Sequence, residues 1–219
     1  MSIDLPSELT LLRRSILEMC SEIELRLDQA LKGLFQKKKD PALEVRHGDK
    51  DVNEMEMEIE AICLRILALS NPVAGDLRFV LAVMRINNNL ERIGDLEKSI
   101  AKRALSLIKN PMDLPEGLPV MAETTRDMLR ACVQALADED AERARKVRRS
   151  DQIVDDLQKE VIAWVQQEIP RQIDSTAAAI DIMSIARKLE RIADVATNIS
   201  EDVIFLVEGS MVRHTPSKA

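Results

Sequence analysis

A pair of carboxylates four residues apart occurs twice in the chain. Glu91 and Asp95 lie in the segment Leu-Glu-Arg-Ile-Gly-Asp, and Glu190 and Asp194 lie in Leu-Glu-Arg-Ile-Ala-Asp, 99 residues later. On a helix, residues four apart share one face, about one turn apart, with roughly 6 Å between their Cβ atoms. Like charges at this spacing mildly destabilise a helix. Their recurrence at one register in both halves therefore favours a cation site.

Each pair has a candidate second half earlier in the same repeat. Asp49 and Asn53 precede the first pair, and Asp151 and Asp155 precede the second. If the helices that carry them are neighbours, the two stripes converge on one site per repeat. Carboxylate and amide oxygens suit Mg²⁺, Mn²⁺, Ca²⁺ or iron rather than a metal that prefers thiolates. A solvated acidic face, screened by the arginines at positions 92 and 191, stays open as the other interpretation.

Long helices must position these groups. Gly and Pro are scarce and Tyr is absent, whereas Ala, Leu, Ile, Glu, Lys and Arg are abundant, as expected for helical proteins. Ser7 is the expected N-cap of the first helix, Pro170 separates the last two, and Gly209 ends the last. The periodicity of apolar residues predicts six helices, over residues 7–38, 40–69, 73–108, 119–137, 140–168 and 174–207.

The helix pattern is itself duplicated. The third and sixth predicted helices align at an offset of 99 residues, and the second and fifth align at an offset of 102. Glu97 interrupts the apolar seam of the third helix, whereas Ala196 continues it in the sixth. We therefore predict an all-α fold of two tandem three-helix bundles, over residues 1–110 and 111–209, followed by a flexible tail at 210–219.

The first carboxylate pair is predicted to face away from the core of its own bundle. At about 100° per residue, Glu91 and Asp95 lie roughly 130–170° from the apolar seam of their helix. Leu77, Leu81 and Met84 precede them on the same face. An apolar patch that leads into a carboxylate pair is unusual for a helix that meets only water. We therefore expect Leu77, Leu81 and Met84 to bind a protein partner.

Composition excludes several classes of protein. The formal net charge of −7 and the few aromatic residues argue against nucleic acid as a partner. No apolar run approaches the roughly 18 residues of a membrane span, and no secretory signal is evident. Three isolated cysteines predict inert thiols and a reducing cytoplasm as the location.

Catalytic patterns are also missing from the sequence. His47 and His214 fall within no nucleophile or zinc pattern, and no Gly-rich phosphate loop occurs. The basic residues between Arg143 and Arg149 follow acidic ones at 138–142, so we interpret them as a solvated, charge-paired face. We therefore predict that the protein is not an enzyme.

Several motifs together resemble the PhoU family of bacterial phosphate-import regulators. Asn71–Arg78 is similar to the family's turn into its third helix, and Asp49–Asn53 to the signature of its second. Leu90–Asp95 and Leu189–Asp194 resemble its paired Glu-x-x-x-Asp motifs, and Asn198–Glu201 resembles the extension after the second. The resemblance spans nearly the whole chain, including the duplication.

This resemblance implies a function and a set of ligands. It implies a cytoplasmic, often dimeric regulator that links the ATPase subunit of the Pst phosphate importer to a sensor histidine kinase, with any membrane association indirect. It also implies iron, manganese, magnesium or zinc on the acidic motifs. The first site is expected to bind metal differently or more weakly than the second. It has Ser99 in place of Asn198 and Glu97 in place of Ala196, and Lys98 and Lys102 lie nearby. The implied ligands are Glu91, Asp95, Glu190 and Asp194, supported by Asp49, Asn53, Asp151, Asp155 and Asn198.

A metal-dependent phosphohydrolase-like or polyphosphate-binding protein is the alternative function. Clustered carboxylates can hold two metal ions for phosphate-ester hydrolysis. We expect no cationic side chain and no His beside the motifs that could take part in catalysis. This expected absence argues against the alternative.

Overall fold

Amphipathic helices make up nearly all of the described chain. The structure, a computed structural model, describes residues 4–210, apart from the side chains of residues 49 and 50. Within this range it contains no strand. The predicted tail mostly lies outside the described residues. In chain order the helices are α1 (Leu5–Phe35), α2 (Lys39–His47), α3 (Asp49–Ser70), α4 (Ala74–Lys109), α5 (Gly117–Asp138), α6 (Ala141–Arg171), the 3-10 helix η1 (Ile173–Ser175) and α7 (Thr176–Glu208).

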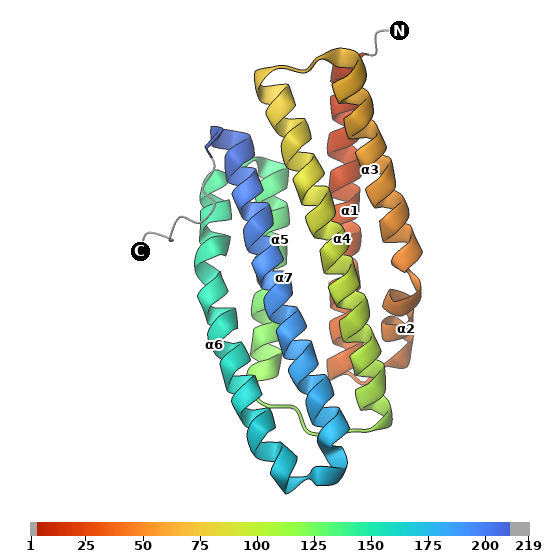
Figure 1. Cartoon of the computed structure of the whole chain (residues 1–219), viewed down its shortest axis with the longest axis vertical. Coiled ribbons are helices and arrows are strands. Elements are labelled where there is room, and N and C mark those ends of the chain that lie inside the picture. The colour runs from red at the N-terminus through yellow and green to blue at the C-terminus, as the bar shows by residue number, and fades with distance from the viewer. Residues whose placement is uncertain (1–3, 211–219) are drawn as a thin grey trace.

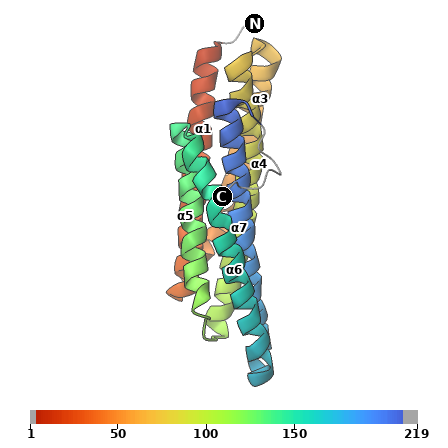
Figure 2. The same ribbon diagram turned by 90° about the vertical axis from the view of Figure 1, so that its left-hand side faces the viewer.

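The helices form two bundles that lie side by side. Helices α1 to α4 pack against one another in the first bundle, and α5 to α7 do so in the second. Figure 1 shows α4 and α7 adjacent at the centre, between α3 and α6, and Figure 2 shows α5 beside α1. None of the helices within residues 4–210 combines the length and the hydrophobicity of a membrane-spanning segment. The predicted all-α fold of two tandem repeats is thus confirmed.

Several predicted helix boundaries need correction. The first helix begins at Leu5 rather than at Ser7, because Pro6 fits the first turn of a helix, where no backbone N–H bond is needed. Pro170 lies inside the last turn of α6 rather than between helices. Gly209 ends α7 as predicted, in the left-handed conformation with φ of 72°. Helix α4 ends at Lys109 and α5 begins at Gly117, and the domain boundary at residue 110 stays a prediction.

The predicted single helix over residues 40–69 is wrong, because the chain breaks at Gly48 between α2 and α3. Arg26 of α1, only 2% exposed, donates from Nη1 to the Gly48 carbonyl at 2.7 Å and from Nη2 to the Val45 carbonyl at 3.1 Å. These bonds satisfy two backbone carbonyls near the end of α2. In the second repeat, Ser150 replaces Gly48 at the 102-residue offset and α6 continues through it.

The same arginine explains the interruption in the seam of α4. Glu97 is fully buried, and its Oε2 lies 3.5 Å from Nε of Arg26. Burial raises the pKa of Glu97 well above its ordinary value, and the nearby Arg26 opposes this rise. Ala196 is buried at the equivalent place in the second repeat. The buried polar pair is therefore a feature of the first repeat alone among the described residues.

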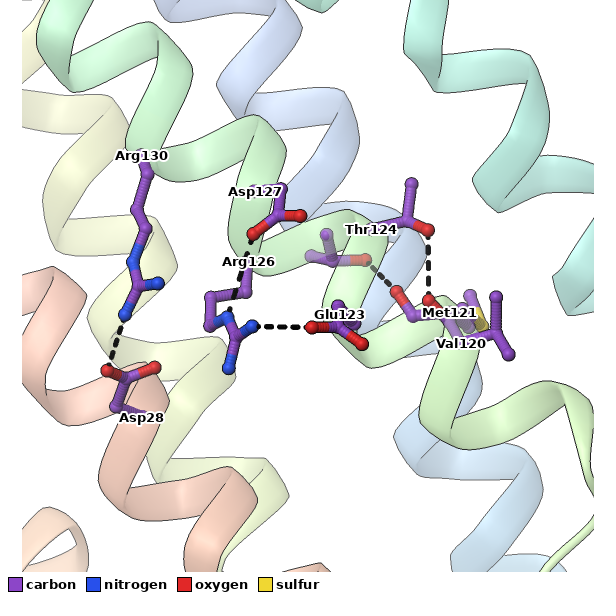
Figure 3. A network of polar contacts seen from close by, with 9 residues as sticks. Asp28, Val120, Met121, Glu123, Thr124, Arg126, Asp127 and Arg130 are labelled. Atoms are coloured by element: carbon purple, nitrogen blue, oxygen red, sulfur yellow. Dashed lines mark hydrogen bonds and ion pairs between the residues drawn. The ribbon is translucent and has the colours of Figure 1, made fainter.

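Ion pairs cross from one bundle to the other between α1 and α5. Figure 3 shows Arg130 of α5 reaching Asp28 of α1, at 2.7 Å, while Arg126 of α5 stays on its own helix with Glu123. Near the other end of the same interface, Arg13 pairs with Glu139 at 2.6 Å. These pairs help to hold the bundles in one relative position.

A second set of ion pairs joins α4 to α7. Arg103 Nη1 lies 2.7 Å from Asp181 Oδ1, and Arg85 Nη1 lies 3.5 Å from Asp202 Oδ1. Arg85 also stacks over the ring of Phe205, 5.1 Å from its centroid. Because the higher-numbered residue of α4 pairs with the lower-numbered residue of α7, the two helices run antiparallel, as Figure 1 shows.

We predict that Arg26→Met destabilises the protein by about 3–5 kcal/mol, because it leaves Glu97 and two carbonyls buried without their donor. The double variant Arg26→Met/Glu97→Ala should be less destabilised than the sum of the single variants. Chemical denaturation measures both effects. Arg14→Met is the matched control on α1, because its ion pair with Glu18 is exposed, and it should change the free energy of unfolding much less than Arg26→Met does. If the destabilisation of the double variant equals the sum of the two single variants, the pairing of Arg26 with Glu97 is contradicted.

Candidate functional site

An acidic cluster lies where α6 packs against α7. Asp151 and Asp155 of α6 and Glu190 of α7 are half-buried, and Asp194 of α7 is more exposed. The charge of Asp155 helps to raise the pKa values of Asp151, Glu190 and Asp194, so the four carboxylates lie close together. The structure therefore brings together the two carboxylate pairs that the sequence places on neighbouring helices of the second repeat.

Burial and mutual repulsion both disfavour the charged forms of these carboxylates. Burial, followed by the charges of Asp194 and Asp155, raises the pKa of Asp151 to about 6. Burial is also the main cause of the raised pKa of Glu190 and of Asp194, which Arg191 partly opposes. The Thr197 hydroxyl lies near enough to lower the pKa of Asp151, although it makes no hydrogen bond of regular geometry to any described residue.

This donor set fits a hard cation in its chemistry. A bound cation would stabilise carboxylates whose ionised forms burial and neighbouring charges disfavour. Within the described side chains, no three Asp, Glu, His or Cys residues are arranged as metal ligands. Binding would therefore require the side chains of the cluster to turn toward a common point.

The first repeat presents a less complete set of described ligands. Glu91 of α4 is half-buried, and Asp95 of α4 and Asn53 of α3 are exposed. Asp49 begins α3, and its side chain lies outside the described residues. The metal role of these four residues stays a prediction.

The two repeats share a groove between α4 and α7, with a volume of about 650 Å³. Because α4 and α7 are equivalent helices packed antiparallel, most of the lining consists of pairs related by the 99-residue offset. One aspartate of each carboxylate pair faces this groove, as does Asn198 with its counterpart Ser99. The lining residues are Arg92, Asp95, Leu96, Ser99, Lys188, Arg191, Asp194, Val195, Thr197 and Asn198.

The groove corrects the expectation that no cationic partner lies beside the motifs. Arg92, Lys188 and Arg191 line it together with Asp95 and Asp194. Lys188 is half-buried and donates to Ser184 Oγ at 3.2 Å. Its pKa is lowered by burial, then by the charge of Arg103 and other arginines nearby. Lys188 could not be found from the duplication, because its counterpart at the offset is Asn89.

The expected partner-binding residues are less exposed than the pattern suggests. Leu77, Leu81 and Met84 are all half-buried, and Met84 packs against the core. A more exposed apolar stripe, which sequence analysis missed, runs along α3 at helical spacing. It comprises Met57, Ala61, Leu64 and Ala68, of which Met57 is 58% and Leu64 is 52% exposed.

The cysteines are placed as expected for inert thiols. Cys20, Cys63 and Cys132 are free and buried. Burial raises the pKa of Cys20 and of Cys63 to about 12, and raises that of Cys132 well above its ordinary value. All three are therefore uncharged near neutral pH and poor nucleophiles.

Comparison with known proteins matches the two repeats to one family. Residues 16–104 and 118–203 each match the model of the PhoU domain. The chain belongs to the PhoU family. The PhoU homolog of Zymomonas mobilis, named a phosphate-specific transport system accessory protein, is 35% identical over 203 residues, which are 92% of this chain and 85% of that protein. The Escherichia coli accessory protein PhoU is 30% identical, over 95% of this chain and 87% of its own.

Solved PhoU structures share the fold as well as the sequence. The crystal structure of PhoU from Pseudomonas aeruginosa gives a TM-score of 0.90 at 31% identity, covering 94% of this chain and all of that one. PhoU from Streptococcus pneumoniae, titled a phosphate transport system regulatory protein, gives 0.87 at 29% identity over 95% of this chain and 99% of its own. The likeness therefore includes both bundles and their arrangement.

We predict that Asp151→Asn stabilises the metal-free protein near pH 7. The folded state holds the Asp151 proton more tightly than the unfolded state, so this residue's contribution to stability falls as pH rises from 3.8 through about 6. Removing the charge should raise the free energy of unfolding by about 1 kcal/mol at pH 7 and change it little below pH 4. The figure for pH 7 is reduced because Asp151 is partly exposed to solvent.

Denaturation across this pH range, in chelator, measures the effect. Asp156→Asn is the control, since Asp156 is exposed on the same helix and its hydrogen bond to Lys159 lowers its pKa. That variant should not gain stability at pH 7. A destabilised Asp151→Asn protein, or a gain independent of pH, would contradict the proposed repulsion.

Proposed function

We propose that this PhoU protein is a cytoplasmic, non-enzymatic regulator of phosphate uptake and of the phosphate-starvation response. It acts as an adaptor between the ATPase subunit of the Pst importer and a sensor histidine kinase. The observation that carries the proposal is the likeness over nearly the whole chain to proteins named accessory or regulatory proteins of phosphate transport. The placement of charged groups from both repeats on one groove is consistent with a binding role.

We further propose that the acidic motifs hold a metal, either iron, manganese, magnesium or zinc. Such an ion would neutralise the clustered carboxylates and tie α6 to α7 in the second repeat. The residues that would hold it are Glu190, Asp194, Asp151 and Asp155, with Asn198 nearby. In the first repeat they are Glu91, Asp95, Asn53 and Asp49. The raised pKa values of the second cluster support this assignment.

Metal analysis of protein purified without chelator tests the metal proposal. The double variant Glu91→Ala/Glu190→Ala should lose most of the metal found in the wild type, and Glu190→Ala alone should lose more than Glu91→Ala alone. Glu160→Ala is the control, because Glu160 is exposed on α6 outside the cluster. Equal metal in the wild type and the double variant would exclude these carboxylates as ligands.

Partner binding tests the adaptor proposal separately. We expect Leu81→Asp to abolish binding to the ATPase subunit or the kinase while helicity, measured by circular dichroism, is unchanged. Leu64→Asp places the same charge on the exposed stripe of α3 and should leave that binding intact. If Leu64→Asp abolishes binding and Leu81→Asp does not, the partner surface lies on α3 instead. We propose that the protein is a homodimer, which sedimentation of the wild type measures.

One observation favours the phosphohydrolase-like or polyphosphate-binding alternative. Arg92, Lys188 and Arg191 line the groove beside Asp95 and Asp194, and cations of this kind can stabilise phosphoryl oxygens. Metal-stimulated hydrolysis of a phosphate ester would favour the enzyme. The names of the relatives favour the accessory role.

A further inference from the structure

The groove between α4 and α7 gathers positive charge in a protein whose net charge is −7. Arg92 comes from α4, and Lys188 and Arg191 come from α7. Ser99, Thr197 and Asn198 add hydroxyl and amide groups to the same lining. Arginine and lysine beside such neutral donors are the usual partners of a tetrahedral oxyanion.

The two arginines of the groove differ from the others at this interface. Arg85 and Arg103 pair with Asp202 and Asp181 across the junction of α4 and α7. Within the described part of the chain, Arg92 and Arg191 have no ion pair or side-chain hydrogen bond, and both are exposed. Because they are equivalent residues of the two repeats, the antiparallel packing directs one guanidinium from each repeat to a single groove.

We propose that this groove binds a phosphate-type oxyanion, with Arg92, Arg191 and Lys188 as its cationic ligands. The site lies between the repeats and needs both of them. It shares Asp95 and Asp194 with the proposed metal sites, but its cationic ligands are the basic side chains of the groove.

The two aspartates of the groove define which oxyanion it accepts. Asp95 and Asp194 reduce the formal charge of the lining from +3 to +1, since three cations stand beside two carboxylates. A carboxylate repels an anion that carries no proton, but it accepts a hydrogen bond from a P–OH group. Phosphate retains a proton near pH 7 and sulfate does not, so the groove should prefer phosphate over sulfate.

The size of the groove leaves two sources for this ligand. A volume of about 650 Å³ exceeds the size of a single phosphate ion. The ligand is therefore either free orthophosphate or one phosphoryl group of a longer chain. Tripolyphosphate, used beside orthophosphate, distinguishes the two.

Calorimetric titration of chelator-treated, full-length protein tests the proposal. The probes are inorganic phosphate, sulfate and tripolyphosphate at pH 7 and matched ionic strength. We expect saturable phosphate binding that is about tenfold or more tighter than sulfate binding. Arg92→Gln/Arg191→Gln should weaken phosphate binding by about tenfold or more. Arg187→Gln should bind like the wild type, because Arg187 is an exposed arginine on α7 outside the groove lining.

Tripolyphosphate binding that needs Arg92 and Arg191, without orthophosphate binding, would assign the groove to a phosphoryl chain. The proposal is overturned if neither orthophosphate nor tripolyphosphate binds saturably, or if the double variant binds them as tightly as the wild type does. Circular dichroism shows that the variant is folded. Unchanged metal content in the same variant shows that the test is independent of the proposed metal site.

Discussion

The antiparallel packing of α4 against α7 is the constraint on which the candidate site depends. Each of these helices buries one apolar seam in its own bundle and presents a second face to its counterpart. Ion pairs at Arg103–Asp181 and Arg85–Asp202 hold the two helices in one register. Because the helices carry the same motif, this packing places Asp95 and Asp194 in one groove. The duplicated motif thereby contributes side chains from both repeats to one groove.

The two repeats have diverged around this shared frame. In the first, Arg26, which is buried beside Glu97, donates to the carbonyls of Val45 and Gly48 at the break just before the start of α3. In the second, Ala196 leaves an apolar core, α6 is continuous, and four carboxylates meet between α6 and α7. Among the described side chains, more carboxylates come together in the second repeat than in the first, so the case for a cation is stronger there.

Sequence periodicity predicted what depends on local pattern, and failed where tertiary contacts decide. The seams of α4 and α7, the duplication and the helical stop at Gly209 followed from spacing and turn chemistry. The break at Gly48 did not, because residues 40–69 carry a continuous helical pattern and the arginine that satisfies the broken end comes from α1. The convergence of Asp151 with Glu190 was predicted from matched stripes. Lys188 was missed because the sequence pattern of α7 alone does not show which of its residues line the groove with α4.

The central claim is that the repeated carboxylates gather into a cation site where the helices of the second repeat meet. Anomalous diffraction from crystals grown with Mn²⁺ locates such an ion directly. We expect a peak between α6 and α7, in contact with Glu190 and Asp194. A peak elsewhere, or no peak in crystals whose dissolved protein contains manganese, would contradict it and leave the cluster as a repulsive acidic surface.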